Sequence, residues 1–207
     1  MTDDQLPELP AGAFAKQDGS DDLAFYAPPR LVSHIDDRAV AALTGFYRDM
    51  LPTGRILDLM SSWVSHLPEG RRFETVIGHG MNAAELSANP QLDRWFVQDL
   101  NRQPMLELED GSFDAALCCV GVQYLQRPVA VFAEVRRTLA PGAPFIVSFS
   151  NRCFPTKAVA IWQALDTSGH AALVQLYLDR AGFGATTIDV LADGRTSDPL
   201  VVVTGRA

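Results

Sequence analysis

The sequence predicts an α/β fold built on a mostly parallel sheet with helices on both faces. The first observation is an apolar run at residues 95–97 that leads directly to the acid Asp99. The second is a turn signal at residues 110–112, followed by the apolar run 113–120, which has the length of a buried strand. The third is helical spacing of apolar residues over 129–139, stopped by a Pro-Gly pair before another apolar run. This order of strand, helix and strand indicates parallel strands.

The remaining elements lie on either side of this unit. Helices are predicted over residues 36–50, 82–89, 155–165 and 169–181. A strand is predicted over residues 145–149, and the apolar runs 185–191 and 200–204 are expected to form a C-terminal antiparallel hairpin. The acidic residues 1–23 are predicted to be a flexible arm, and residues 24–207 a single domain.

Composition and charge narrow the class of protein. The chain has 207 residues, of which 47% are hydrophobic, and no apolar run has the roughly 18 residues that a membrane helix needs. The acidic start carries no secretory signal, so a cytoplasmic location is expected. The formal net charge is -8 and no Lys/Arg cluster is longer than a pair, which argues against nucleic acid as a partner. The three cysteines have no metal-ligand spacing, so no metal is expected.

Two segments carry a resemblance to a known family. The stretches EDGSFDAAL, residues 109–117, and EVRRTLAPGAPFIVS, residues 134–148, resemble the class I S-adenosylmethionine-dependent methyltransferases, in particular the type 11 group. The resemblance covers residues 55–183. Within it, residues 55–59 are similar to the family's first strand with its terminal acid Asp58, and Asp99-Leu100 is similar to the pair that holds adenine.

The resemblance implies a Rossmann-like methyltransferase fold with a seven-stranded sheet, whose second strand is residues 75–78. It also implies an enzyme that transfers a methyl group from S-adenosyl-L-methionine to a small molecule. It implies a monomer or homodimer, with Asp58 orienting the methionine end of the cofactor and Asp99 accepting a hydrogen bond from the adenine amine. The cofactor-binding residues expected are Asp58, Ser61, Ser62, Gly78, His79, Gly80, Met81, Asn82, Asp99, Leu100 and Val120. Residues 24–51 are expected to form a lid over the cofactor.

The chain departs from the family pattern at two places. The loop after the first strand, residues 60–64, has no glycine, so Met60 and Trp63 are expected to point away from the cofactor and the serines to cap a helix. Gly80 stands where the family has an acid that binds the ribose hydroxyls. Asn82, His79 or backbone groups could make that contact instead. These departures keep open a catalytically inactive, cofactor-binding protein with a sensing or interaction role, whereas a nicotinamide enzyme lacks its glycine motif.

Several residues could face the methyl acceptor. The acceptor-site candidates are Trp63, Tyr124, Asn151 and Arg152, and further polar candidates near the mouth are Tyr26, His34, His66 and His79. Arg152 could hold a carboxylate or phosphate of the substrate, or could form a surface salt bridge. Cys118 is expected in the core, with Cys119 either in the core or near the ligand edge. His170, on a predicted outer helix, is expected to be structural.

Overall fold

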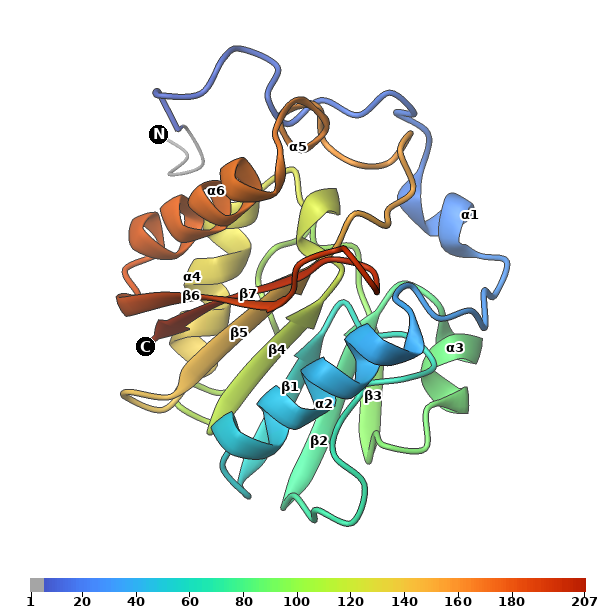
Figure 1. The fold of residues 1–207 in the computed structure, drawn as a ribbon, viewed down its shortest axis with the longest axis vertical. Coiled ribbons are helices and arrows are strands. Elements are labelled where there is room, and N and C mark those ends of the chain that lie inside the picture. The colour runs from blue at the N-terminus through green and yellow to red at the C-terminus, as the bar shows by residue number, and fades with distance from the viewer. Residues whose placement is uncertain (1–5) are drawn as a thin grey trace.

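A single sheet of seven strands forms the centre of the computed structural model, which describes residues 6–207 and leaves the first part of the predicted arm outside the description. The strand order is β3-β2-β1-β4-β5-β7-β6 (Figure 1). The strands are β1 Arg55–Leu59, β2 Thr75–Gly80, β3 Arg94–Val97, β4 Ala115–Cys119, β5 Pro144–Phe149, β6 Gly184–Ala192 and β7 Leu200–Arg206. The first five pair in parallel, and β7 is antiparallel to both β5 and β6. The predicted α/β sheet with its closing hairpin is therefore confirmed.

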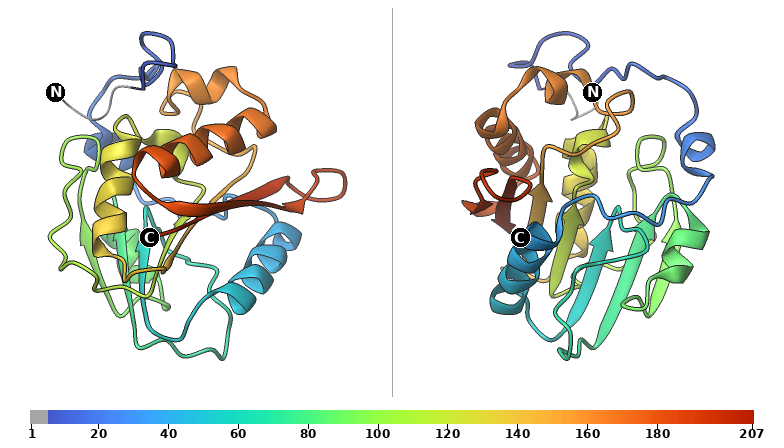
Figure 2. Two further views of the ribbon diagram at one scale, coloured as in Figure 1. Left: turned by 90° about the vertical axis from the view of Figure 1, so that its left-hand side faces the viewer. Right: turned by 45° about the vertical axis from the view of Figure 1, so that its right-hand side comes forward.

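Helices cover both faces of this sheet (Figure 2). The α-helices of the described residues are α1 Asp22–Tyr26, α2 Asp37–Met50, α3 Ala83–Ala88, α4 Pro128–Thr138, α5 Ala160–Ala164 and α6 Thr167–Arg180. On one face, Leu43 and Tyr47 of α2 are fully buried in a cluster with Ile56 of β1. On the other face, the ring of Phe132 of α4 lies 5.9 Å from that of Tyr177 of α6. The sheet is thus buried on both faces, as parallel sheets require.

The helix starts follow local capping chemistry. The Asp36 carboxylate accepts a hydrogen bond from the Ala39 amide at 2.9 Å and fixes the start of α2. The Asn82 side-chain oxygen accepts from the amides of Ala84 and Glu85, at 2.9 and 3.0 Å, and fixes the start of α3. These caps place the first turn of α3 directly after the carboxyl end of β2.

The connection between β1 and β2 corrects one expectation. Residues 61–74 contain no helix, so Ser61 and Ser62 cap none. Local backbone conformation accounts for this, because His66 has φ 56° and Gly70 has φ 76°, both incompatible with a right-handed helix. The predicted helix over residues 155–165 is likewise shortened to α5, since the chain before it forms a bridge between Val159 and Lys16.

The N-terminal segment is the second correction. Within the predicted flexible arm, Leu6 and Ala13 are buried against the domain. The fully buried ammonium group of Lys157 donates to the Ser20 carbonyl at 2.8 Å and pairs with the carboxylates of Asp18 and Asp22, at 3.3 and 3.1 Å. We call residues 18–35 the strap, since they pass over the carboxyl edge of the sheet (Figure 1).

The predicted lid helix does not cover that edge. Helix α2 packs on the face of the sheet because its apolar stripe of Ala39, Leu43 and Tyr47 matches the sheet's own buried side chains. The covering segment is the strap instead, and it includes the short helix α1. No helix within residues 6–207 has the length and apolar character needed to span a membrane.

Candidate active site

A pocket lies at the carboxyl ends of β1, β2 and β4 and under the strap, with a volume of about 1130 Å³ including its open mouth. Every predicted cofactor residue except Gly78 lines it, as do the acceptor candidates Trp63 and Tyr124. Tyr26, His34, His66 and Cys119 line it as well, whereas Cys118 is buried in the core. Residues separated by up to 132 positions in the chain, from Asp22 to Phe154, therefore share one cavity.

Three predicted residues lie outside the pocket. A side chain at Gly78 would come within 2.3 Å of Leu92, so this glycine serves the packing of β2. Asn151 and Arg152 do not line the cavity. The Arg152 guanidinium is exposed and lies 3.2 Å from the carboxylate of Asp198, which is the surface salt bridge that the sequence left as an alternative. His170, as expected, is structural: its ring stacks on Trp162 with centroids 3.9 Å apart.

Asp58 stands at the end of β1, and its side chain is 2% exposed. Its carboxylate accepts a hydrogen bond of 2.6 Å from the Ser61 hydroxyl. Burial raises the pKa of Asp58 to about 6, and the Ser61 bond opposes that shift. A carboxylate held this deeply gains from any cation or donor that a ligand brings to it.

The first loop is drawn against the end of β2. Met60 has φ 56°, a left-handed conformation that is unusual for a side chain of this size, and it lines the pocket that it was expected to avoid. The amide of Ser61 donates to the His79 carbonyl at 2.6 Å, and the amide of Met60 donates to Nδ1 of His79 at 3.2 Å. These hydrogen bonds to β2 fix the path of the loop, although no helix follows it.

His79 is committed to this arrangement. Its Nε2 lies 2.9 Å from the Gln98 carbonyl, so it donates there while Nδ1 accepts from Met60. Burial lowers the pKa of His79 to about 4, and the bond to Gln98 opposes that shift. The imidazole is therefore neutral at pH 7, with both of its nitrogens already used.

Gly80 shows why the strand acid is missing. A Cβ on Gly80 would lie 2.5 Å from the backbone carbonyl oxygen of Ser61, which is closer than real Cβ contacts come. No aspartate can stand here while the first loop keeps its path. The path of the glycine-free first loop and the absence of an acid at residue 80 therefore depend on each other.

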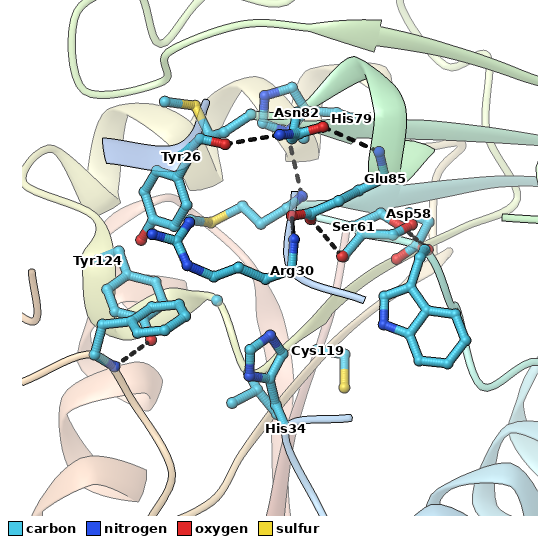
Figure 3. A pocket seen from close by; sticks show the side chains of 18 of the residues that line it. Tyr26, Arg30, His34, Asp58, Ser61, His79, Asn82, Glu85, Cys119 and Tyr124 are labelled. Carbon is cyan, nitrogen blue, oxygen red and sulfur yellow. Dashed lines mark hydrogen bonds between the residues drawn. The ribbon is translucent and has the colours of Figure 1, made fainter. Parts of the chain in front are cut away.

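Asn82 holds the strap. Besides capping α3, its side-chain amide donates to the carbonyls of Tyr26 and Ala27, at 2.8 and 2.9 Å (Figure 3). Its oxygen and its nitrogen are both engaged, as are both nitrogens of His79. The two side chains that the sequence offered for a ribose contact are thus occupied by bonds within the protein.

Three charged residues of the pocket, Asp22, Arg30 and Glu85, are absent from the sites predicted from the sequence. The Arg30 guanidinium lies 4.6 Å from the ring centre of Phe25 and 5.2 Å from that of Phe154, and it donates to the Phe25 carbonyl at 2.9 Å. The Glu85 carboxylate accepts from the Arg30 amide and from the Ser62 hydroxyl, both at 2.6 Å (Figure 3). In the sequence, Glu85 looks like an ordinary acid in the first turn of a helix. Its position in the cavity becomes visible only in the folded structure.

The strap side of the pocket presents groups with shifted protonation. Burial lowers the pKa values of His34 and His66 below the usual range of histidine. Burial also raises the pKa values of the Cys119 thiol and the Tyr124 hydroxyl to about 12. The Tyr124 oxygen accepts from the Phe154 amide at 2.8 Å. At neutral pH the two imidazoles are therefore neutral, while the thiol and the phenol keep their protons.

The chain is similar to known methyltransferases in sequence and in fold. Residues 65–147 match the family model described as a methyltransferase domain. The chain is 28% identical over 109 residues to a biotin biosynthesis bifunctional protein of Teredinibacter turnerae, a match that covers 50% of this chain and 18% of that protein. The structure of an S-adenosylmethionine-dependent methyltransferase from Mesorhizobium loti is similar with a TM-score of 0.57 at 19% identity, over 80% of this chain and 98% of the other. Residues 65–147 thus match a methyltransferase domain, and the chain has the fold of S-adenosylmethionine-dependent methyltransferases.

A second solved structure adds a bound ligand to the comparison. Phosphoethanolamine N-methyltransferase 2 of Haemonchus contortus, in complex with S-adenosyl-L-methionine, is similar with a TM-score of 0.54 at 13% identity, over 82% of this chain and 52% of that one. At this identity the likeness concerns the fold alone. The sequence resemblance and the predicted fold class are thereby confirmed.

Two buried acids reach the pocket from the carboxyl edge of the sheet: Asp58 lies near the end of β1, and Asp99 follows β3. Gly121 lets the first loop pack against the turn after β4, because a Cβ there would lie 2.8 Å from the Cβ of Met60.

Proposed function

We propose that the chain is an S-adenosyl-L-methionine-dependent methyltransferase that acts on a small molecule. The observation that carries the proposal is the pocket that joins buried Asp58 to buried Asp99 beneath the strap. In this proposal Asp58 meets the methionine end of the cofactor, and Asp99 with the Leu100 amide meets adenine. The match of residues 65–147 to a methyltransferase domain supports the assignment.

The bound cofactor would supply an electrophilic methyl group. A lone pair of the acceptor would form the new bond to the methyl carbon as the carbon–sulfur bond breaks. The electron pair of the broken bond would stay on sulfur, which leaves S-adenosylhomocysteine. The protein's part is to align the two reactants and to exclude water.

A small acceptor is favoured by the cover over the pocket. The Trp63 indole donates to the Val32 carbonyl of the strap at 3.0 Å, and Tyr26 of the strap lies 6.4 Å from Tyr124, measured between ring centres. These contacts narrow the mouth at two places, which suits a metabolite better than a macromolecule. A cytoplasmic location and a monomeric or homodimeric state are predictions from the sequence.

Isothermal titration calorimetry with S-adenosylhomocysteine tests the proposal. The wild-type chain is expected to bind, and Asp99→Ala to bind more weakly by about 1 to 3 kcal/mol, the range for leaving a partner unsatisfied. Asp49→Asn, at an exposed position on α2, serves as the control and should bind like wild type. Wild-type affinity in Asp99→Ala would contradict the adenine assignment.

A transfer assay separates an enzyme from the inactive alternative. The chain is incubated with S-adenosyl-L-methionine carrying a labelled methyl group and with a metabolite extract, then passed through a membrane that retains macromolecules. Label in the small-molecule filtrate is the expected result. Label retained with macromolecules would contradict a small acceptor, and binding of the cofactor without any transfer would favour a sensing or interaction role.

A further inference from the structure

We propose that Glu85, on helix α3, takes the place of the missing strand acid and binds the ribose hydroxyls of the cofactor. The inference rests on the proposed function, since it names how that cofactor would be held. It starts from the carboxyl end of β2, where a ribose-binding acid would be expected. Gly80 stands at this position, and the Ser61 carbonyl 2.5 Å from its virtual Cβ excludes any side chain.

The other polar groups near the end of β2 are occupied. His79 uses one ring nitrogen on the Met60 amide and the other on the Gln98 carbonyl. Asn82 uses its oxygen as the cap of α3 and its nitrogen on the carbonyls of the strap. A hydrogen bond from either side chain to a ligand would cost an existing bond of similar strength.

Glu85 differs from both because its carboxylate still has lone pairs that can accept hydrogen bonds from a ligand. Its carboxylate lines the pocket and accepts hydrogen bonds from two neutral donors, the Ser62 hydroxyl and the Arg30 amide. A carboxylate has about four lone-pair sites, so two can remain for a ligand. A pair of neighbouring hydroxyl groups is a donor set that fits two free carboxylate lone pairs.

The position of Glu85 fits the same role. It lies five residues beyond Gly80, in the first turn of α3, and its bond to Ser62 keeps it beside the first loop. Figure 3 shows the Glu85 carboxylate between Asn82 and Ser61, directed into the cavity beside Arg30. The acid has therefore moved from the strand to the helix that follows it, while the loop has moved into the space that the strand side chain would fill.

A thermodynamic cycle on protein and ligand tests this inference. Affinities of wild type and Glu85→Gln are measured by calorimetry for S-adenosylhomocysteine and for its 2′,3′-dideoxy analogue. Glu85→Gln is expected to weaken S-adenosylhomocysteine roughly tenfold, because bonds to a charged acceptor are about twice as strong as neutral ones. For the dideoxy analogue the two proteins should bind alike, because the hydroxyl groups that would sense the charge are absent.

The cycle distinguishes the inference from a merely structural role. If Glu85 only held the strap through Arg30, the substitution would weaken both ligands equally, and that result would overturn the inference. Glu74→Gln, at an exposed acid just before β2 on the opposite edge of the sheet, is the matched control and should leave both affinities unchanged. Glu85→Asp, which withdraws the carboxylate by one methylene, gives a second variant with the same expected pattern should the Gln protein not fold. If wild type binds neither ligand, the proposed function itself fails.

Discussion

Single residues of the pocket owe their states to burial and to committed hydrogen bonds. His79 and Asn82 look in the sequence like groups free to bind a ligand, and the structure uses both to join the first loop and the strap to β2. Asp58 accepts a hydrogen bond from Ser61 in a buried position. A buried carboxylate gains from a cation or donor that a ligand brings to it.

Asp58 should make the stability of the ligand-free protein depend on pH. Its pKa of about 6 lies above the value of 3.8 for a free aspartate, so the folded state binds the proton more tightly than the unfolded state. The stabilisation is fully present below pH 4 and is lost as the pH rises through about 6, at about 1.4 kcal/mol for each unit of pKa shift. Asp58→Asn should remove this dependence, and urea unfolding at pH 5 and pH 8 measures it.

The control for this prediction is Asp49→Asn, whose pH profile should parallel wild type. Parallel profiles for wild type and Asp58→Asn would mean that Asp58 is ionised without cost in the folded state. Cofactor binding should move in the opposite direction, weakening below pH 6, because a protonated Asp58 no longer attracts the ammonium group of the ligand.

At the scale of elements, the strap depends on Lys157, a buried lysine on the loop before α5. Its ammonium group holds Asp18, Ser20 and Asp22 together, and it lies 5.0 Å from the ring centre of Phe25. Removal of one partner from a buried ion pair costs about 3 kcal/mol or more. Lys157→Met should therefore lower the free energy of unfolding by roughly that amount and expose the strap to limited proteolysis.

Arg180→Met provides the contrast within the same N-terminal region. The Arg180 guanidinium pairs with Glu8 at 2.7 Å, but it is half exposed, and such pairs contribute about 1 kcal/mol or less. Equal losses in Lys157→Met and Arg180→Met, or a strap that stays resistant to protease in both, would contradict the role assigned to Lys157.

Elements with strong periodicity could be read from the sequence, and irregular ones could not. Helix α2 and the strand β4 follow from apolar spacing, and both lie where it placed them. The connection over residues 61–74 takes its path from long-range bonds to His79, which no local pattern records. Glu85 and Arg30 escaped the sequence analysis for the same reason, since their roles depend on segments 55 positions apart.

At the scale of the whole molecule, the pocket couples the strap to the sheet, so a ligand should order both. Hydrogen exchange with mass spectrometry should show slower exchange in peptides covering residues 20–35 and 60–66 when S-adenosylhomocysteine is added. The hairpin of β6 and β7, which forms the far edge of the sheet, is the internal control and should not change. Protection of residues 60–66 without protection of residues 20–35 would show that the strap does not take part in binding.

The close contact between the Ser61 carbonyl and Gly80 also bears on how such a chain can change. Because the two groups share one space, a side chain can enter at residue 80 only after the first loop has moved, and the loop has reason to move only if it regains glycine. A side chain introduced at residue 80 alone therefore meets the Ser61 carbonyl, whereas glycine at residue 60 alone suits the left-handed backbone already present there. A mutational library that varies residues 60–62 together with residue 80 samples both changes at once.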